Sequence, residues 1–293
     1  MGVGFNSIYH ITDSPSFITG DKYVILDPHE WYFNGGVQFD FVEDNLNQEF
    51  PDQFAPFRIP CDKSFKGTIF RYPLRTEEDS IDSEISKKIY KPDEILKMFQ
   101  TFYENESINC LLFLKYIERI TFYELKKGAT EPELLYTIQL ENADRVRNQR
   151  RLIVENIVTM MNSLKSKKLG KNNRLKASYV ASFSRQKGEN SSWLILNYLD
   201  DLYEVETYFQ KKFNKSIRDY KFIPNVGLAV PLNKLNVMGR LFCFLPLPVS
   251  MPFQVSVHGY FAVRTNQVLI LLYSNYNFYV KPFFFLKKIF LIG

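Results

Sequence analysis

Apolar residues follow a helical spacing in three segments of the chain. In "KPDEILKMFQTFYE" they recur three and four positions apart, at Ile95, Met98, Phe99, Phe102 and Tyr103. This spacing predicts a helix with one buried face, which begins near Pro92. The segment 141–165 repeats the pattern with Val146, Ile153, Ile157, Met160 and Met161, and "DLYEVETYFQKKF" predicts a third helix.

Runs of β-branched and aromatic residues predict strands in much of the remaining chain. "SFITGDKYVILD" reads as a hairpin that turns at Gly20–Asp21, "KGTIFRYPLR" as a strand, and "CLLFLKYIERITFYEL" as two strands. Further strands are expected in "RLKASYVASFS", "SWLILNYL", "FIPNVGLAVPL", "GRLFCFLPLP" and "FQVSVHGYFAV". Residues 30–64 have no sustained period and are expected to be irregular. Helices and strands that do not alternate strictly indicate an α+β fold.

Changes in composition divide the chain into four parts. Residues 1–76 are rich in Gly, Pro, Asp and Phe, and the acidic-then-basic segment 77–89 is expected to be a linker. Residues 90–266 hold most of the periodic segments and are expected to fold as one α+β region. Residues 267–293 form an apolar tail.

The tail has an unusual composition, and three interpretations of it are open. The first interpretation is a membrane span. The tail is rich in Phe, Tyr, Leu and Ile, but Asn, Pro and Lys interrupt it, so it lacks the apolar stretch of roughly 20 residues that a span needs. A pair of apolar strands is the second interpretation. The third interpretation is that translation has read through into noncoding sequence. It is favoured because the residues that dominate the tail are those encoded by AT-rich codons.

Charge and cysteine content narrow the function classes. The 293 residues carry a formal net charge of +5, too mild to indicate nucleic acid or a membrane surface as a partner. The three cysteines are widely spaced and form no Cys-x-x-Cys pair, which is typical of a reducing compartment. The N-terminus has no signal-peptide pattern, so a cytoplasmic location is expected.

Side chains with the usual catalytic chemistry form no cluster in the sequence. His10, His29 and His258 are far apart without metal-ligand spacing, so no metal site is expected. Asp13, Asp21 and Asp27 occur where turns favour Asp. The basic run "KSKKLGKNNRLK" is expected to be a solvated loop, because it lacks the aromatic residues that accompany nucleic-acid binding.

The N-terminal "GVGFNSIYHITDSPSFITGDKYVILDPHEWYF" resembles the lid and following hairpin of the GHKL ATPases, and most closely the sacsin/Nov group. Similar blocks follow in the same order: "DQFAPF", "GTIFRYPLRT", "SEIS", "CLLFLKYIERITFYE" and "FCFLPLPVSMPFQVSVHGYFAV". The resemblance covers about residues 2–266. It implies the C-terminal part of a GHKL-type ATP-binding domain, followed by a mixed middle-type region.

The resemblance also assigns candidate nucleotide-binding residues. In the lid motif the backbone amides lie on the nucleotide phosphates, and these positions here are Gly2, Val3, Gly4 and Phe5. The Gly-Thr of the closing strand, whose hydroxyl lies on the adenine side, is Gly67–Thr68 here. The cofactors that the family implies are ATP and magnesium.

The chain departs from the family pattern in a way that bears on activity. It has no Asp-x-Gly-x-Gly segment, whose Asp reads adenine, and no preceding helix with the acidic residue and Asn that activate water and hold magnesium. We therefore expect a fragment with no catalytic residues of its own, no cofactor and no ATPase activity.

The leading hypothesis is a piece of an ATP-dependent, sacsin-like molecular chaperone or co-chaperone whose partners are client proteins or other chaperones. The alternatives are a nucleotide-independent protein-binding module and, less favoured by the motifs, a DNA-handling GHKL relative.

Overall fold

The computed structural model describes residues 3–59, 63–166, 174–186, 188, 190–219, 223–233 and 238–259. The chain divides into two compact units, Met1–Gln100 and Thr101–Gly293, and the division falls within helix α5, Pro92–Asn105. Each unit combines helices with a sheet, as expected for an α+β chain. Residues 260–293, which include all of the expected tail at 267–293, lie outside the described residues.

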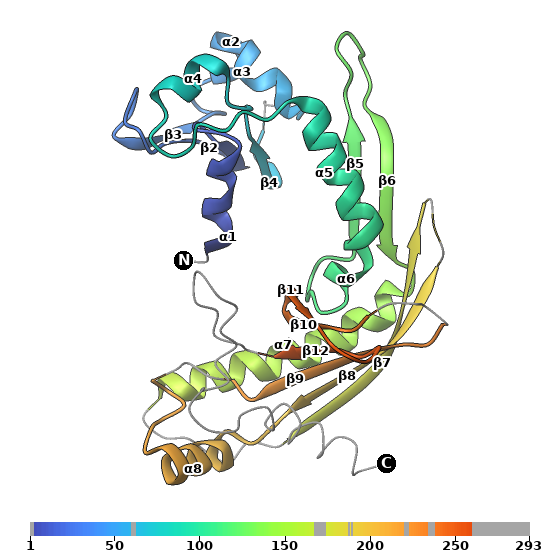
Figure 1. The fold of residues 1–293 in the computed structure, drawn as a ribbon. Helices are drawn as coiled ribbons and strands as arrows, with labels where there is room; N and C mark the ends of the chain where they lie inside the picture. Colours follow the sequence, from blue (N-terminus) through green and yellow to red (C-terminus); the bar gives the residue numbers. More distant parts are fainter. Residues whose placement is uncertain are drawn as a thin grey trace. The chain divides into compact units, whose positions relative to one another are not determined.

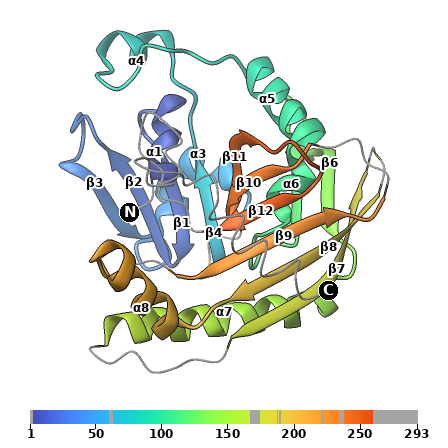
Figure 2. The same cartoon turned by 60° about the horizontal axis from the view of Figure 1, so that its bottom comes forward.

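The first unit is built on four antiparallel strands in the order β3-β2-β1-β4 (Figure 1 and Figure 2). The strands are β1 Ser16–Gly20, β2 Lys22–Asp27, β3 Gly35–Asp40 and β4 Phe65–Arg71. The short helices are α1 Val3–Asn6, η1 Ser7–His10, α2 Leu46–Glu49, α3 Pro51–Phe54, η2 Ala55–Phe57 and α4 Glu77–Asp82. The predicted hairpin is confirmed, with its turn at Gly20, whose φ is +61°.

An aromatic cluster forms the core of this unit. The ring of Tyr23 packs against Phe54 and Phe57, with centroid distances of 5.0 and 5.8 Å. Ile18 and Phe41 complete the set of buried apolar residues. Because Phe54 and Phe57 come from the short helices α3 and η2, these helices close one face of the sheet.

The prediction that residues 30–64 are irregular is wrong for much of that range. The range contains β3, α2, α3 and η2. Strand β3 has no buried residue, so it lacks the alternation that marks a half-buried strand. Gly36 lets β3 approach β2, because a Cβ there would lie 2.6 Å from the Ile25 carbonyl oxygen.

The acidic segment expected to be a linker contains a helix. Thr76 caps α4 in a capping box: its hydroxyl accepts from the Asp79 amide, and its own amide donates to the Asp79 carboxylate. Ser83, directly after α4, is buried. The segment therefore packs within the first unit, and the domain boundaries drawn from composition stay predictions.

The second unit contains a mixed sheet of eight strands in the order β11-β10-β12-β9-β8-β7-β6-β5. All neighbouring pairs are antiparallel except β10 and β12, which are parallel. The strands are β5 Arg119–Glu124, β6 Glu133–Leu140, β7 Leu175–Arg185, β8 Ser191–Leu199, β9 Asn225–Pro231, β10 Arg240–Cys243, β11 Leu245–Ser250 and β12 Ser256–Gly259. The helices are α6 Ser107–Leu111, α7 Ala143–Lys165 and α8 Leu202–Phe213.

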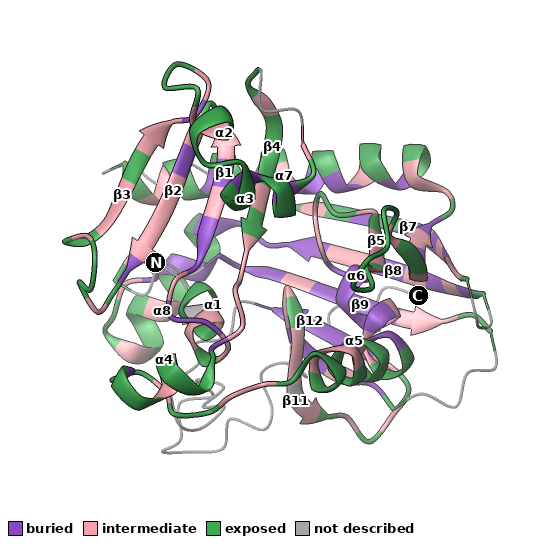
Figure 3. Cartoon of the chain, turned by 90° about the horizontal axis from the view of Figure 1, so that it is seen from above, coloured by how far each residue is buried: buried purple, intermediate pink, exposed green. Residues whose placement is uncertain are grey.

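Helix α7 lies along one face of this sheet, over β7 and β8 (Figure 2). Its buried residues are Val146, Arg150, Ile153, Ile157 and Met160, spaced four and three positions apart on one side of the helix. They pack on buried sheet residues that include Phe183 and Trp193. In Figure 3 the buried positions concentrate on the central strands, while α7 also presents an exposed face.

Three sequence expectations for this region need correction. The first half of "CLLFLKYIERITFYEL" is the end of α6 and a loop, and only its second half forms a strand, β5. "GRLFCFLPLP" forms two strands rather than one, divided at Phe244, whose φ of +64° turns the chain. Helix α5 buries only Tyr103 of its predicted face, and Met98 and Phe99 are exposed.

Candidate functional site

The structure places the predicted nucleotide-binding residues on two elements of the first unit. Gly2 lies outside the described residues. Val3, Gly4 and Phe5 belong to α1, a helix of only four residues, and Thr68 belongs to β4. The phosphate-binding assignment of these positions stays a prediction.

The side chains of Phe5 and Thr68 are exposed, and each contacts a neighbouring side chain of the first unit. The Phe5 ring lies 6.1 Å from that of Phe70, centroid to centroid. The Thr68 hydroxyl lies 2.9 Å from the Thr19 hydroxyl, and Thr19 also donates to the Gly67 carbonyl at 3.2 Å. Thr68 therefore has a structural role in linking β1 to β4, whatever else it binds.

A buried ion pair is the main polar feature of this unit. The Arg75 side chain is fully buried, and its Nε and Nη2 donate to both carboxylate oxygens of Asp13 at 2.6 and 2.9 Å. Nη1 donates to the carbonyls of His10 and Lys88, and Nη2 to that of Tyr9. The guanidinium thus ties the N-terminal segment, the end of β4 and the segment after α4 together.

Further donors surround the same carboxylate. Ser83 Oγ donates to Asp13 at 2.9 Å, and His29 Nε2 lies 3.3 Å from it. Burial raises the pKa of Asp13, but the bonds from Arg75, Ser83 and His29 outweigh it, so the pKa is lowered. The expectation that Asp13 serves a turn missed this ion pair, whereas Asp27 does accept the backbone amides of residues 31–33.

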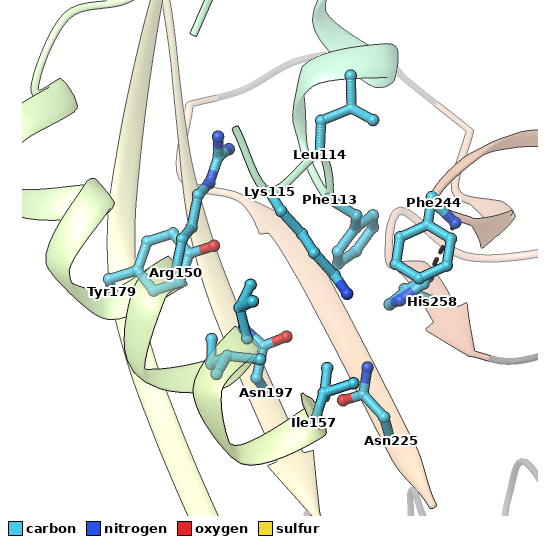
Figure 4. Close-up of a pocket in the computed structure, with 12 residues that line it drawn as sticks. Phe113, Leu114, Lys115, Arg150, Ile157, Tyr179, Asn197, Asn225, Phe244 and His258 are labelled. Atoms are coloured by element: carbon cyan, nitrogen blue, oxygen red, sulfur yellow. Dashed lines mark hydrogen bonds between the residues drawn. The ribbon is translucent and has the colours of Figure 1, made fainter. Parts of the chain in front are cut away.

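The second unit contains a pocket between α7, the sheet and the loop after α6 (Figure 4). Its volume is about 30 Å³, room for one or two water molecules or a small ion. The lining combines apolar residues of α7 with polar and cationic residues of the strands and the loop. It consists of Phe113, Leu114, Lys115, Arg150, Ile153, Val154, Ile157, Tyr179, Asn197, Asn225, Phe244 and His258, none of which is acidic.

The floor of the pocket is a polar row across three strands. Asn197 of β8 pairs with Gly227 of β9, and Gly227 pairs with His258 of β12, so the three residues share one face of the sheet. A Cβ at Gly227 would lie 2.9 Å from the Phe113 ring and 3.1 Å from the His258 Cβ. Glycine at this position therefore allows Phe113 to stack on His258, with 5.1 Å between the ring centroids.

Arg150 enters the pocket from the buried side of α7. Its Nη2 donates to the Leu111 carbonyl at 2.8 Å and its Nη1 to the Ile117 carbonyl at 3.3 Å. These carbonyls lie at the two ends of the loop that carries Lys115, so the arginine fixes that loop. In the described part of the chain, Arg150 Nε is buried without a hydrogen-bond partner.

Lys115 extends from the loop toward the middle of the pocket (Figure 4). Its ammonium lies 4.8 Å from the centroid of the Phe244 ring, and within the described residues it forms no ion pair. Burial lowers the pKa of Lys115. Burial, with a smaller contribution from Lys115, also lowers the pKa of His258 to about 4, although a bond to the Phe242 carbonyl opposes it, so this imidazole is neutral at pH 7.

Two asparagines leave buried polar atoms in the same pocket. Asn197 Nδ2 and Asn225 Oδ1 have no hydrogen-bond partner among the residues that the structure describes. Tyr179 lies beside Arg150 and Asn197, and burial raises its pKa despite their opposing effect. Together with Arg150 Nε, three buried polar atoms of this one pocket lack partners.

Sequence analysis missed this pocket, although one signal for it exists. The buried face expected for helix 141–165 included Val146, Ile153, Ile157, Met160 and Met161, of which Met161 is exposed. Arg150 falls on the same face by spacing. An arginine within an apolar stripe is unusual, because buried charges need partners. The other polar residues come from strands whose register the sequence does not reveal.

The described residues show neither metal-site geometry nor a transmembrane helix. No group of three or more His, Cys, Asp or Glu in these ranges is arranged to hold a metal ion. Across the same ranges, no helix combines the length and the apolar character needed to cross a bilayer.

Comparison with known proteins gives two findings. The Sacsin domain family model matches residues 1–137, which cover the first unit and continue into β6. Human sacsin is 28% identical to this chain over 297 residues, a match that covers 91% of this chain and 6% of sacsin. The chain thus spans a small part of the length of this relative, and it is a distant homologue of sacsin over most of its own length.

Proposed function

We propose that this chain contributes to a sacsin-like molecular chaperone or co-chaperone and binds client proteins or other chaperones. The observation that carries the proposal is the similarity to human sacsin over 91% of the chain, together with the Sacsin domain match. The GHKL-type ATPase origin of residues 1–76 is part of this proposal. It rests on the resemblance of the glycine-containing N-terminal segment to the lid of those ATPases.

The second unit offers an apolar surface suited to protein binding. Strand β5 is the edge of the eight-stranded sheet, and it forms a hairpin with β6 (Figure 1). Tyr123 of β5 pairs with Leu134 of β6, and Leu125 follows two residues after Tyr123. These three side chains are 56%, 42% and 48% exposed, respectively. Exposed apolar side chains beside a free strand edge are typical of surfaces that bind other chains.

Client binding is tested by the suppression of aggregation. We expect the 293-residue chain, at a one-to-one ratio, to lower the light scattering of a chemically unfolded model protein diluted into buffer. Tyr123→Ser combined with Leu134→Ser should weaken this effect. Tyr203→Ser on α8 is the matched control, since this tyrosine is also exposed. Scattering that stays unchanged at a tenfold excess of the chain would contradict the proposal.

We also propose that this chain by itself binds no ATP, because its sequence holds no Asp-x-Gly-x-Gly segment to read adenine. Losing a charged hydrogen-bond partner typically costs about 1.5–3 kcal/mol, roughly ten- to a hundredfold in affinity. Titration calorimetry with magnesium-ATP tests this. Binding in the micromolar range that Gly4→Val weakens would instead favour a working lid. Client binding that responds to ATP would argue against the alternative, a nucleotide-independent protein-binding module.

A further inference from the structure

The pocket of the second unit gathers positive charge without any negative charge. Lys115 and Arg150 both line it, and none of its twelve lining residues is acidic. Arg150 is only 4% exposed and bonds to two carbonyl oxygens, which are neutral acceptors. Glu118 lies outside the lining and interacts with Arg150, but no such acidic neighbour is found for Lys115 among the described residues. Withdrawing a cation such as Lys115 from water without a counter-charge is unfavourable, so this arrangement favours a bound anion.

The unpartnered polar atoms point to the same chemistry. Arg150 Nε–H and the Asn197 side-chain NH₂ are buried donors without a well-formed hydrogen bond among the described residues. The Tyr179 side chain interacts with both residues, so the two donors share one neighbouring acceptor. The unpartnered atom of Asn225 is its oxygen, an acceptor, so this residue does not belong to the donor set. Buried donors of this kind normally have an acceptor, and a group with several oxygen atoms supplies more than one.

The surroundings would hold such a group in place. Phe113, Phe244 and the neutral His258 form an aromatic wall, with ring centroids of Phe244 and His258 4.9 Å apart. Low polarity on this side strengthens the attraction between Lys115 and an anion. Arg150 bonds to both ends of the loop that carries Lys115, and the Lys115 ammonium lies 4.8 Å from the centroid of the Phe244 ring, so the loop presents this cation at the pocket.

We propose that this pocket binds a small oxyanion, the carboxylate or phosphate group of a ligand, with Lys115 as its main charge partner and Arg150 and Asn197 as hydrogen-bond donors. A volume of about 30 Å³ limits the buried part of the ligand to this group, and the remainder of a larger ligand would stay outside. The site is independent of the proposed client surface on the β5–β6 hairpin, so either proposal can fail alone.

Anion binding is tested on the full chain by titration calorimetry and thermal unfolding. Sodium phosphate and sodium acetate are titrated separately at constant ionic strength, and sodium chloride alone is the third titration. We expect saturable binding near one equivalent and a saturable rise in melting temperature with phosphate, acetate or both. Phosphate alone would identify a phosphate group as the ligand, and acetate alone a carboxylate.

Variants separate the pocket from general electrostatics. Lys115→Met should weaken binding roughly tenfold or more, and Lys115→Arg should retain it. Lys127→Met is the matched control, because it removes the same charge from an exposed turn of the same unit. Asn197→Asp, which places a fixed carboxylate in the pocket, should abolish binding and serves as the test if Lys115→Met does not fold.

Three outcomes would overturn the proposal. The first is an absence of saturable binding, which would mean that only water fills the pocket. The second is saturation with chloride alone. The third is an equal loss of affinity in Lys115→Met and Lys127→Met, which would reduce the effect to net charge.

Discussion

Each of the two units buries an arginine, and the two arginines are neutralised differently. Arg75 in the first unit donates five hydrogen bonds, two of them to the carboxylate of Asp13. Arg150 in the second unit donates two, both to backbone carbonyls, and its Nε has no partner in the described ranges. All N–H donors of the Arg75 side chain are therefore used within the protein, whereas the Nε–H of Arg150 is left to bond to a ligand.

This difference separates a structural site from a ligand site. Asp13 and Arg75 are 62 positions apart in sequence, and their contact joins segments that share no regular secondary structure. Nothing remains there for a ligand to satisfy. The pocket lining around Arg150, by contrast, contains a second cation and two amides but no carboxylate. Buried polar groups without a hydrogen-bond or charge partner in the protein are therefore better indicators of a ligand site than buried polar groups that have one.

The largest effect is expected from breaking the satisfied pair. Arg75→Met leaves the buried Asp13 carboxylate without its charge partner and should lower the free energy of unfolding by about 3–5 kcal/mol. Urea unfolding followed by circular dichroism measures the loss. Hydrogen exchange should locate it in the first unit.

The double variant Asp13→Asn with Arg75→Met controls for lost packing. It should be less destabilised than the sum of the two single variants, since it leaves no buried charge unpaired. Additive losses would mean that the two charges do not stabilise each other, and the contrast with Arg150 would then fail.

The second-largest effect expected is a pH dependence of the free energy of unfolding, caused by His258 in the pocket. The pKa of His258 is about 4 in the folded chain, against an ordinary value of 6.5. Between these values the unfolded chain binds a proton that the folded chain does not, so stability falls as the pH drops from 6.5 to 4. This group contributes about 3 kcal/mol to the fall.

His258→Asn should reduce that loss, because the variant has no titrating ring. Wild type and variant are compared by urea unfolding at several pH values, and their difference isolates His258 from other groups such as Asp13. Lys115, Arg150 and Tyr179 line the same pocket, and burial raises the pKa of Tyr179 further above this pH range. Parallel pH profiles would show that the imidazole is not buried in a neutral form.

A smaller loss is expected at the unsatisfied arginine. Arg150→Met removes two hydrogen bonds to carbonyls but also removes a buried charge that forms no ion pair with a described residue. The two effects oppose each other, so the free energy of unfolding should fall by only about 1–2 kcal/mol. A loss as large as that of Arg75→Met would indicate that Arg150 is neutralised in the folded chain, with Glu118 as the acidic residue that interacts with it.

Much of the fold follows from local sequence patterns, and the failures share a cause. The helical spacing in 141–165 and the alternation in "RLKASYVASFS" predicted α7 and β7 within two residues of their bounds. The pattern failed at β3, an exposed strand, and at α6, a short helix within an apolar run. In both, tertiary contacts decide the local structure, and periodicity carries no information about them.

The candidate sites were less predictable than the elements that carry them. The position of Arg150 on the apolar face of its helix could be read from spacing alone. Its neighbours Asn197 and His258 meet only because β8, β9 and β12 are adjacent, although β10 and β11 lie between β9 and β12 in sequence. The Asp13–Arg75 pair likewise depends on tertiary contacts and left no motif.

The smallest effect concerns the exposed face of β4, where the resemblance to ATPases placed Thr68. Its hydroxyl lies against that of Thr19 on the surface, and exposed hydrogen bonds contribute little because water replaces them. Thr68→Val should therefore change the free energy of unfolding by less than about 0.5 kcal/mol, well below the loss for Arg75→Met in the same unit. Thr19→Val is the matched control, since it removes the other partner of the same bond. Urea unfolding of both variants gives the comparison. A loss above about 1 kcal/mol in Thr68→Val alone would mean that this threonine satisfies a buried group rather than a surface bond.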